Sequence, residues 1–551
     1  MLDHRGGRQP LPLEQELTRE DGAVQLAQRK LAFRHARTLP RAGGATTFRT
    51  VIAVVQLDAL SVPLVEQLLG EGRLPALAEL RRRGRLLPMP APATYFGDRE
   101  TAHTGTSVTH HGQTFPLQWS ASEQRLRPID WFDSAEPIWE RVARGGGRAL
   151  VVDPYEGRRP RRDVGFAVSG WQFAHSAVLQ RWTKPRREYP SLVRRYGRAP
   201  EVEDVYGRPS RRGLLRLRSQ LLAAPERVAR LVTDRLARSS HDLVWAELAA
   251  GHMAGHHFWD LRHLVGDELS EPERIDLERT VADTYVELDR ALGEIVDALP
   301  AGTDVLVFSA VGMDVNRSRT DLLPAMLERV LGATAAADAP SAGSTIWRVR
   351  ASVPSRARIA ATRALPDRLV LELGARIFMH GVDWGRTRAF ALPADHDGYV
   401  RFNVRDRERD GIVAADELDA LADEIREGLM TFESPEGTPV VESVARTDEL
   451  YGRGPRSDRL PDLVVRWSWT PTADVGVAIS SRYGEVRRRG LGLGRSGNHV
   501  DGAWLLAVPG RGRRPSDRDE GQLVDVAATV AARLGVDEAG LTGNPLLERV
   551  S

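Results

Sequence analysis

The chain has 551 residues, of which 42% are hydrophobic and 28% are charged, a composition typical of a soluble globular protein with a large core. Its 77 lysine and arginine residues against 75 aspartate and glutamate residues give a net charge of +2, so charge gives no reason to expect a nucleic acid duplex as partner. The absence of cysteine excludes disulfide bonds, thiolate zinc ligands and a cysteine nucleophile.

The sequence also lacks the usual signals for a membrane or secretory destination. No stretch reaches the roughly 18 consecutive apolar residues that a transmembrane helix requires. The N-terminal residues do not combine a positively charged start with an apolar core, which is the pattern of a signal peptide. We therefore expect a cytoplasmic protein that does not contact a membrane.

Strand and helix patterns alternate along most of the chain. Residues 1–48 are polar and weakly periodic, which indicates a flexible N-terminal extension, and the folded part begins at Val51-Ile-Ala-Val-Val-Gln-Leu57, a run typical of a strand buried on both faces. Further strands are expected at 149–153, 242–248, 304–309, 462–467 and 503–508, and helices at 62–69, 77–83, 224–239, 272–299, 414–430 and 523–534. The alternation predicts an α/β fold with a mostly parallel central sheet and helices on both faces.

Several polar side chains come directly after these strands, where parallel sheets bind their ligands. Asp58 ends the first strand, and His252 and His256 follow the strand at 242–248. Histidines four positions apart lie on one face of a helical turn and can bind one metal ion. His499, which precedes the apolar run 503–508, is a third candidate ligand. The alternative interpretation is that these are surface or capping histidines.

Short motifs along the chain carry a resemblance to a known family. In chain order they are Val54-Val-Gln-Leu-Asp58, Leu74-Pro-Ala-Leu-Ala-Glu-Leu80 with Gly84, Pro92-Ala-Thr94 with Thr104-Gly-Thr-Ser-Val-Thr-His-His-Gly112, Gly255-His256, Ser309-Ala-Val-Gly-Met313, Gly497-Asn-His499-Val-Asp-Gly502, and Val524-Asp-Val-Ala-Ala-Thr529 with Gly543-Asn-Pro-Leu546. Each motif is weak alone, but seven in this order are specific. On these motifs the chain resembles the alkaline phosphatase superfamily, in its type I phosphodiesterase/nucleotide pyrophosphatase branch.

The resemblance implies an alkaline phosphatase-like fold and a site for phosphoryl chemistry. In this family two divalent metals, roughly 4 Å apart, hold a phosphoryl group while a threonine or serine attacks phosphorus. The matching positions are Thr94 as the nucleophile and Asp58 as a metal ligand that supports the reacting oxygen. His252, His256 and His499 match the ligands of the first metal.

The chain departs from the family pattern at positions that hold metal. His252 stands where the family has aspartate, but three neutral imidazoles remain a good zinc set and can lower the pKa of bound water from about 15.7 to about 7. Ala310-Val311 stands where the family has Asp-His, so the second metal keeps only Asp58 and Thr94.

The second metal site is therefore expected to be depleted, and one zinc ion is expected in all. Two oxygen ligands are too few for a tight divalent site. A second ion would need Asp98, Asp314 or Asn316 to replace the lost ligands.

Two functions remain open at this point. The first is a metal-dependent hydrolase of phosphate esters or phosphodiesters, with a small-molecule phosphoester as substrate and Thr94 or water as nucleophile. The second is a catalytically degenerate family member that acts as a ligand-binding or interaction protein.

A segment within the core is expected to form a cap. Residues 346–450 resemble an insert that covers the carboxyl edge of the sheet in some members of the family, which leaves 49–345 and 451–551 as the core. In this insert Arg401 and Arg405 could bind an anionic group, or they could form surface salt bridges with Asp406 and Glu408.

Overall fold

In the computed structural model the described residues are 51–90, 97–155, 157–172, 181–202, 210–262, 269–332, 382–488 and 495–549, together with 369, 372 and 375. The predicted N-terminal extension 1–48 and the predicted nucleophile Thr94 lie outside the described residues.

An eight-stranded sheet forms the centre of the fold, with the strand order β2-β18-β9-β1-β8-β5-β6-β7. Its middle five strands run parallel and are β9 (Asp304–Ser309), β1 (Ile52–Leu57), β8 (Leu243–Leu248), β5 (Ala149–Val152) and β6 (Gly165–Ser169). Beyond β9, β18 (Trp504–Val508) pairs antiparallel with β9 and with the edge strand β2 (Arg85–Pro88), and the other edge strand, β7 (Trp182–Lys184), pairs antiparallel with β6. The predicted, mostly parallel sheet is thus confirmed.

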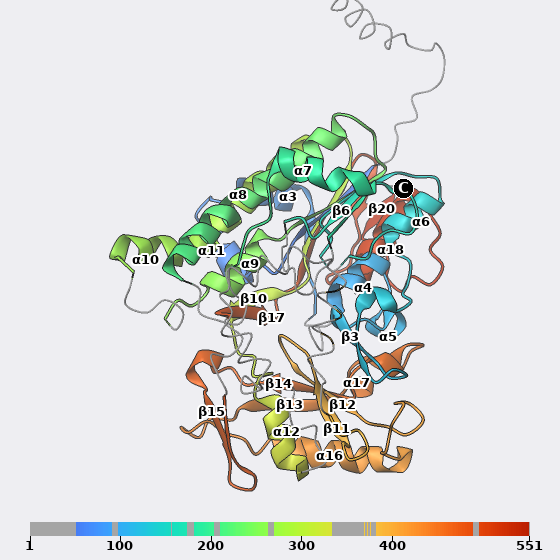
Figure 1. Cartoon of the computed structure of the whole chain (residues 1–551). Helices are drawn as coiled ribbons and strands as arrows, with labels where there is room; N and C mark the ends of the chain where they lie inside the picture. The colour runs from blue at the N-terminus through green and yellow to red at the C-terminus, as the bar shows by residue number, and fades with distance from the viewer. Residues whose placement is uncertain are drawn as a thin grey trace, which may run out of the picture. The chain divides into compact units, whose positions relative to one another are not determined.

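Helices cover both faces of this sheet, because the alternating side chains of its strands are apolar on either side. Alternate residues of β1 show this: Ala53 and Val55 pack into one hydrophobic cluster, and Ile52 and Val54 pack into the other. The helices of the first cluster are α2 (Val62–Gly70), α3 (Pro75–Arg83), α8 (Arg211–Leu236), α9 (Ala250–Phe258) and α11 (Thr280–Asp297). Those of the second are α4 (Asp98–Thr104), α6 (Ile138–Arg144) and α18 (Val524–Leu534). Figure 1 shows α8, α9 and α11 on one side of this region and α4 and α18 on the other.

Shorter elements complete the core. They are α5 (Val108–His111), α7 (Tyr189–Tyr196), α10 (Glu271–Glu278), the antiparallel pair β3 (Leu117–Ser120) and β4 (Arg125–Pro128), the pair β10 (Gly312–Val315) and β17 (Gly497–Val500), and the pair β19 (Arg513–Pro515) and β20 (Leu547–Arg549).

Helix α8 is longer than the predicted helix at 224–239. It begins at Arg211 and includes Pro225, whose ring usually interrupts a helix. The apolar side chains of Leu214, Leu217 and Leu221 extend its buried face into the first cluster, and this burial maintains the helix on the N-terminal side of the proline.

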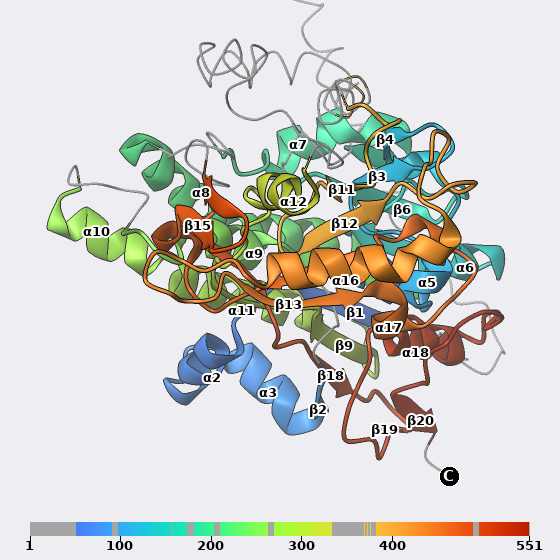
Figure 2. The same ribbon diagram turned by 90° about the horizontal axis from the view of Figure 1, so that it is seen from below.

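A second, antiparallel sheet has the order β11-β12-β14-β13, with β11 (Ala389–Leu392), β12 (Gly398–Phe402), β14 (Leu463–Trp467) and β13 (Val441–Arg446). Helices α12 (Leu323–Leu331) and α16 (Leu418–Leu429) pack into the same hydrophobic cluster, and Figure 2 shows α16 crossing this sheet. The cluster extends from Leu322 to Val486, which is wider than the predicted insert 346–450, because β14 is paired between β12 and β13. The elements α17 (Thr447–Tyr451), β15 (Val477–Ser480) and β16 (Gly484–Arg487) flank it.

Arg401 is a structural residue of the second sheet. Its side chain is fully buried, and its Nε donates a hydrogen bond to Glu408 Oε1 at 2.8 Å. The other carboxylate oxygen, Glu408 Oε2, accepts a hydrogen bond from Trp119 Nε1 of β3 at 2.7 Å. Arg401 thus forms the salt bridge with Glu408 that is one of its two interpretations, but the pair is buried and not at the surface as expected, and it joins β12 to the β3–β4 hairpin.

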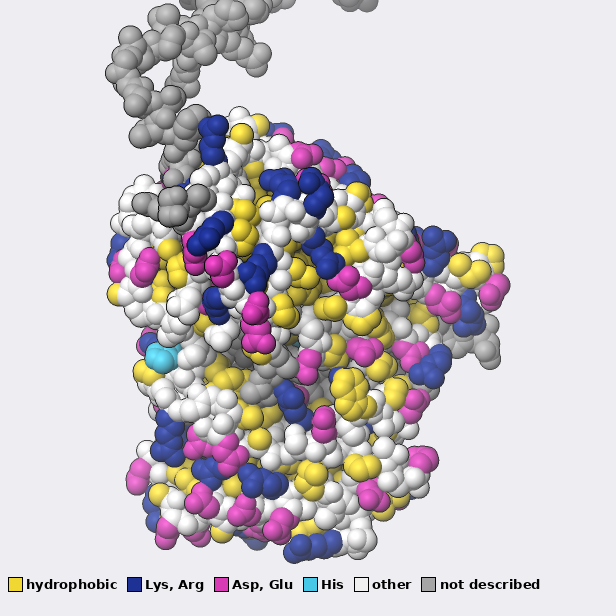
Figure 3. Space-filling view, turned by 180° about the vertical axis from the view of Figure 1, so that it is seen from behind, with side chains coloured by type: hydrophobic (Ala, Val, Ile, Leu, Met, Phe, Trp, Pro, Cys, Tyr) yellow, Lys and Arg dark blue, Asp and Glu magenta, His cyan; other side chains and the backbone are white. Residues whose placement is uncertain are grey.

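The surface carries charges of both signs. Figure 3 shows cationic and anionic side chains interspersed over one face of the molecule. Among the described residues, no helix is both long enough and apolar enough to cross a membrane.

The pair β10–β17 packs closely against α9 through two glycines. A Cβ atom built on Gly497 would lie 2.4 Å from the backbone oxygen of Gly255 and 2.8 Å from Cβ of Trp259. A Cβ atom built on Gly255 would lie 2.5 Å from Cγ of Met313. Gly497 thus allows β17, and Gly255 allows β10, to approach α9 closely enough for His499 to meet the histidines of the helix.

We expect Gly497→Ala to lower the free energy of unfolding by about 1–3 kcal/mol, because the added methyl group overpacks a backbone contact. Urea denaturation of the variant and the wild type measures the difference. Gly476→Ala is the matched control, because its added Cβ would meet no heavy atom within 4 Å. Equal losses of stability in the two variants would contradict the close packing of β17 on α9.

Candidate metal centre

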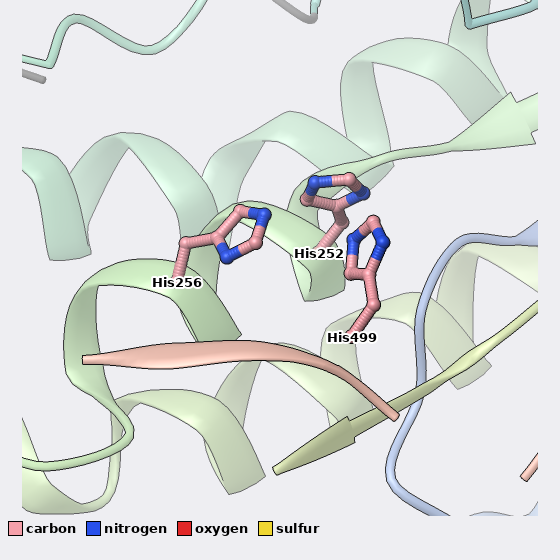
Figure 4. Close-up of side chains that lie close together, drawn as sticks. All are labelled: His252, His256 and His499. Carbon is pink, nitrogen blue, oxygen red and sulfur yellow. The ribbon is translucent and has the colours of Figure 1, made fainter. Parts of the chain in front are cut away.

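Three buried histidines meet beyond the carboxyl end of β8 (Figure 4). His252 and His256 lie one turn apart on α9, which begins two residues after β8 ends, and His499 lies on β17. Their ring centroids are 4.5 Å apart for His252 and His256, 4.7 Å for His252 and His499, and 5.2 Å for His256 and His499. The three predicted ligands are therefore brought together by the fold.

The ring nitrogens of this cluster match what a metal ion requires. His256 Nδ1 donates a hydrogen bond to the carbonyl oxygen of Gly497 at 2.8 Å, and this fixes the tautomer whose Nε2 carries a lone pair. Among the described residues, His256 Nε2 and both ring nitrogens of His499 have no hydrogen-bond partner. Buried polar atoms without a partner are costly, and a shared metal ion would satisfy them.

The spacing of the cluster is slightly wider than a closed metal site. One ligand atom from each histidine can be chosen so that all three lie within 4.8 Å of one another. Tetrahedral zinc with bonds of about 2.0–2.1 Å would bring them to about 3.4 Å. Small rotations of the three side chains would close this difference.

Burial keeps these imidazoles neutral, which is the form that binds metal. It lowers the pKa of His256 and of His499 well below the usual histidine value. Burial also lowers the pKa of His252, although the neighbouring Asp58 carboxylate opposes this change.

Asp58 contacts only one of the three histidines. Its carboxylate follows β1 and has no exposed surface, and its Oδ2 accepts a hydrogen bond from His252 Nδ1. Arg99 NH2 lies 3.4 Å from Oδ2 and 3.5 Å from Oδ1. Burial acts to raise the pKa of Asp58, but Arg99 and His252 together lower it below its usual value, so the carboxylate is ionised.

A small cavity of about 30 Å³ opens beside this cluster, with room for an ion or a water molecule. Asp98 and Arg99 of α4 form part of its wall, together with His252 and His499. Arg99 NH1 lies 3.4 Å from Asp98 Oδ1, while Asp98 Oδ2 has no hydrogen-bond partner among the described residues. Burial raises the pKa of Asp98, and Arg99 only partly offsets this.

The model of the family "Type I phosphodiesterase / nucleotide pyrophosphatase" matches residues 52–490. The chain belongs to this family. No curated protein sequence shows a significant match to it.

Solved structures similar to the chain include a phosphonoacetate hydrolase and an ectonucleotide pyrophosphatase / phosphodiesterase. Phosphonoacetate hydrolase from Sinorhizobium meliloti 1021, in complex with phosphonoformate, is 14% identical with a TM-score of 0.47, over 88% of this chain and 96% of that one. Human ectonucleotide pyrophosphatase / phosphodiesterase 5 is 10% identical with a TM-score of 0.42, over 90% of this chain and 97% of that one.

Ala310 and Val311, at positions where the type I phosphodiesterase family has Asp-His, are fully buried apolar residues. Val311 packs against Ala59 and Met313. The side chains therefore fill space and offer no atom to a metal ion.

The three residues considered as replacement ligands lie in different surroundings. Asp314 Oδ1 accepts a hydrogen bond from Trp259 Nε1 at 3.2 Å. The side chain of Asn316 donates to the carbonyl oxygen of Arg495 at 2.9 Å and accepts from Asn498 Nδ2 at 3.1 Å. Asp98 alone of the three lies in the wall of the cavity.

Three further side chains of the site, His396, Asp395 and Arg495, lie outside every motif of the sequence. His396 stacks on His499 with centroids 4.1 Å apart and planes 21° apart, and burial lowers the pKa of His396 to about 3. Arg495 NH2 donates to Asp395 Oδ2 at 3.1 Å. His396 and Asp395 belong to the predicted insert, so this segment contributes to the site. No periodicity or spacing in the sequence marks them.

The buried contact between Asp58 and Arg99 leads to a stability prediction for the metal-free protein. Asp58→Ala should lower the free energy of unfolding by about 3 kcal/mol or more, because Arg99 and the Nδ1–H group of His252 lose their shared acceptor. The double variant Asp58→Ala with Arg99→Met should lose less than the sum of the two single variants. Urea denaturation of the four proteins measures this coupling.

Glu79→Ala is the matched control, since Glu79 forms an ion pair with Arg82 on the exposed side of α3. We expect little change in stability there. Purely additive losses for Asp58→Ala and Arg99→Met would contradict a coupled buried pair.

Proposed function

We propose that the protein is a metal-dependent hydrolase of phosphate esters or phosphodiesters that uses a single zinc ion held by His252, His256 and His499. The observation that carries the proposal is the meeting of three buried imidazoles beyond the carboxyl end of a parallel sheet, where His256 Nε2 and both ring nitrogens of His499 have no hydrogen-bond partner among the described residues. Membership of the type I phosphodiesterase/nucleotide pyrophosphatase family supports the class of reaction.

The donor set favours zinc over harder cations. Imidazole nitrogens suit zinc and leave a fourth position open, whereas magnesium and calcium prefer carboxylate and carbonyl oxygens. A zinc ion at this site would act as a Lewis acid toward an ester oxygen and lower the pKa of a bound water.

The residues around the histidines would orient a metal ligand, exchange a proton and supply the nucleophile. Asp58 orients His252 by accepting its Nδ1–H, which directs Nε2 toward the metal. Asp98 lines the cavity and burial raises the pKa of its carboxyl group, so Asp98 is the proposed group for proton exchange with the leaving oxygen. Thr94 or a water molecule is the proposed nucleophile.

The substrate is proposed to be a small molecule that inserts only its phosphoryl group. The cavity is small, and its lining includes Asp395 and His396 of the predicted insert as well as Asp98, Arg99, His252 and His499. The remainder of the ester would extend toward this insert.

We expect the purified protein to bind close to one equivalent of zinc, and His256→Ala to lose most of it, because two imidazoles hold zinc far more weakly than three. Elemental analysis after dialysis against zinc measures the content. His110→Ala, at an exposed histidine of α5, should retain the wild-type content. Wild-type protein that remains metal-free when offered zinc would refute the metal site.

We expect the zinc-loaded protein to hydrolyse a nitrophenyl phosphodiester, and the His256→Ala variant to lose this activity. Thr94→Ala should lower turnover by orders of magnitude if threonine attacks phosphorus, and by little if water attacks. Release of nitrophenol is followed by absorbance. A zinc-loaded wild-type protein that binds phosphate but cleaves no ester would favour the alternative of a catalytically inactive, ligand-binding member.

A further inference from the structure

We propose that the guanidinium group of Arg99 binds a phosphoryl oxygen of the substrate and serves as the second cation of this site, in place of a second metal ion. The inference rests on the proposed function for the identity of the substrate, but its geometry is independent of the zinc. It also assigns Asp58 a positioning role instead of a role as a metal ligand.

Arg99 is held at the junction of the cluster and the cavity. Its NH2 lies 3.4 Å from His252 Nδ1 as well as close to both oxygens of Asp58, and its NH1 faces Asp98. Its Cζ lies 4.0 Å from the centre of the Tyr155 ring, which covers one face of the guanidinium. Asp58, Asp98 and Tyr155 thus fix the guanidinium group of Arg99 in the wall of the cavity.

The same contacts leave little place for a second metal ion. Arg99 NH2 is 3.4–3.5 Å from the two oxygens of Asp58, and a metal ligated by those oxygens would lie about 2.0–2.2 Å from them. Two cations would then share a buried space only a few ångströms wide, where their repulsion is barely screened. Ala310 and Val311 supply no further ligand atom to offset it.

The shape and charge of the guanidinium suit a phosphoryl group. Arginine presents several N–H donors in one plane and can bind two oxygens of a phosphoryl group at once. Its present carboxylate contacts, at 3.4–3.5 Å, are longer than the 2.7–2.9 Å of a well-formed charge-assisted hydrogen bond. An anion in the cavity therefore offers Arg99 shorter bonds than its carboxylate neighbours do.

The other arginine of the cavity is less suited to this role. Arg495 NH2 donates to Asp395 Oδ2 at 3.1 Å, so its charge is directed toward the second sheet. Arg99 also shares Asp58 with His252, and the carboxylate therefore positions one candidate metal ligand and one anion-binding group together. A phosphoryl oxygen bound by Arg99 would therefore lie beside a metal ion held by the histidines.

The test compares wild-type protein with Arg99→Met and Arg99→Lys, each with and without zinc. Calorimetric titration with inorganic phosphate gives the affinity, and elemental analysis gives the zinc content. We expect one zinc equivalent in all three proteins. The Kd for phosphate should rise about 10- to 100-fold in Arg99→Met, because a charge-assisted hydrogen-bond donor is lost. It should rise less in Arg99→Lys, which keeps the charge.

Arg262→Met is the matched control, because Arg262 lies just beyond α9, is exposed and pairs with Asp260 outside the cavity. Its phosphate affinity and zinc content should equal those of the wild type. Thermal unfolding shows which variants are folded. If Arg99→Met does not fold, Arg99→Lys still tests the assignment, because it retains the positive charge that the buried carboxylates require.

Each outcome bears on one part of the assignment. Unchanged phosphate affinity in a zinc-loaded Arg99→Met or Arg99→Lys protein would overturn it, as would two zinc equivalents in the wild type. Loss of zinc from both Arg99 variants would show that Arg99 supports the histidines instead of binding the anion, and would also overturn it. A wild type without zinc or hydrolysis refutes the proposed function, whereas phosphate binding that depends on Arg99 in that protein would still support the role of Arg99.

Discussion

The candidate site depends on one buried charge, the carboxylate of Asp58. An ionised side chain with no exposed surface requires partners that are fixed in position, because it cannot be solvated by water. Arg99 and His252 provide them from two different helices, α4 and α9, on opposite faces of the sheet. Asp58, at the end of β1, therefore determines where the guanidinium group of Arg99 lies and how the imidazole of His252 is oriented.

The second constraint is the close approach of β17 to α9. The glycines at 255 and 497 remove the Cβ atoms that would separate α9 from the β10–β17 pair, and the hydrogen bond from His256 to the carbonyl of Gly497 uses the backbone exposed by that approach. The metal ligands on α9 and β17 are far apart in the sequence but share this contact. His499 then also meets His396, so the second sheet and the central sheet both contribute to one small cavity.

The sequence predicts the central sheet well because buried parallel strands are continuous apolar runs, and β1, β5, β8 and β9 are of this kind. The three histidines could be found because they stand after strands and within motifs. Arg99 and His396 could not, because their roles arise from contacts with Asp58 and His499 that no local pattern encodes. The N-terminal part of α8, before Pro225, is likewise not predicted, because its burial against the first cluster is a tertiary contact.

A guanidinium group differs from a metal ion in ways that define the proposed chemistry. Arginine remains charged at every accessible pH and belongs to the chain, so its contribution does not depend on the supply of metal. It donates hydrogen bonds but accepts no lone pair from a hydroxyl group, so it stabilises negative charge without activating a nucleophile as a metal does. On the proposed assignment, anion binding belongs to Arg99 and activation belongs to the histidine cluster. Two functions that a pair of metals would share are thereby assigned to separate residues, and each can be removed without the other.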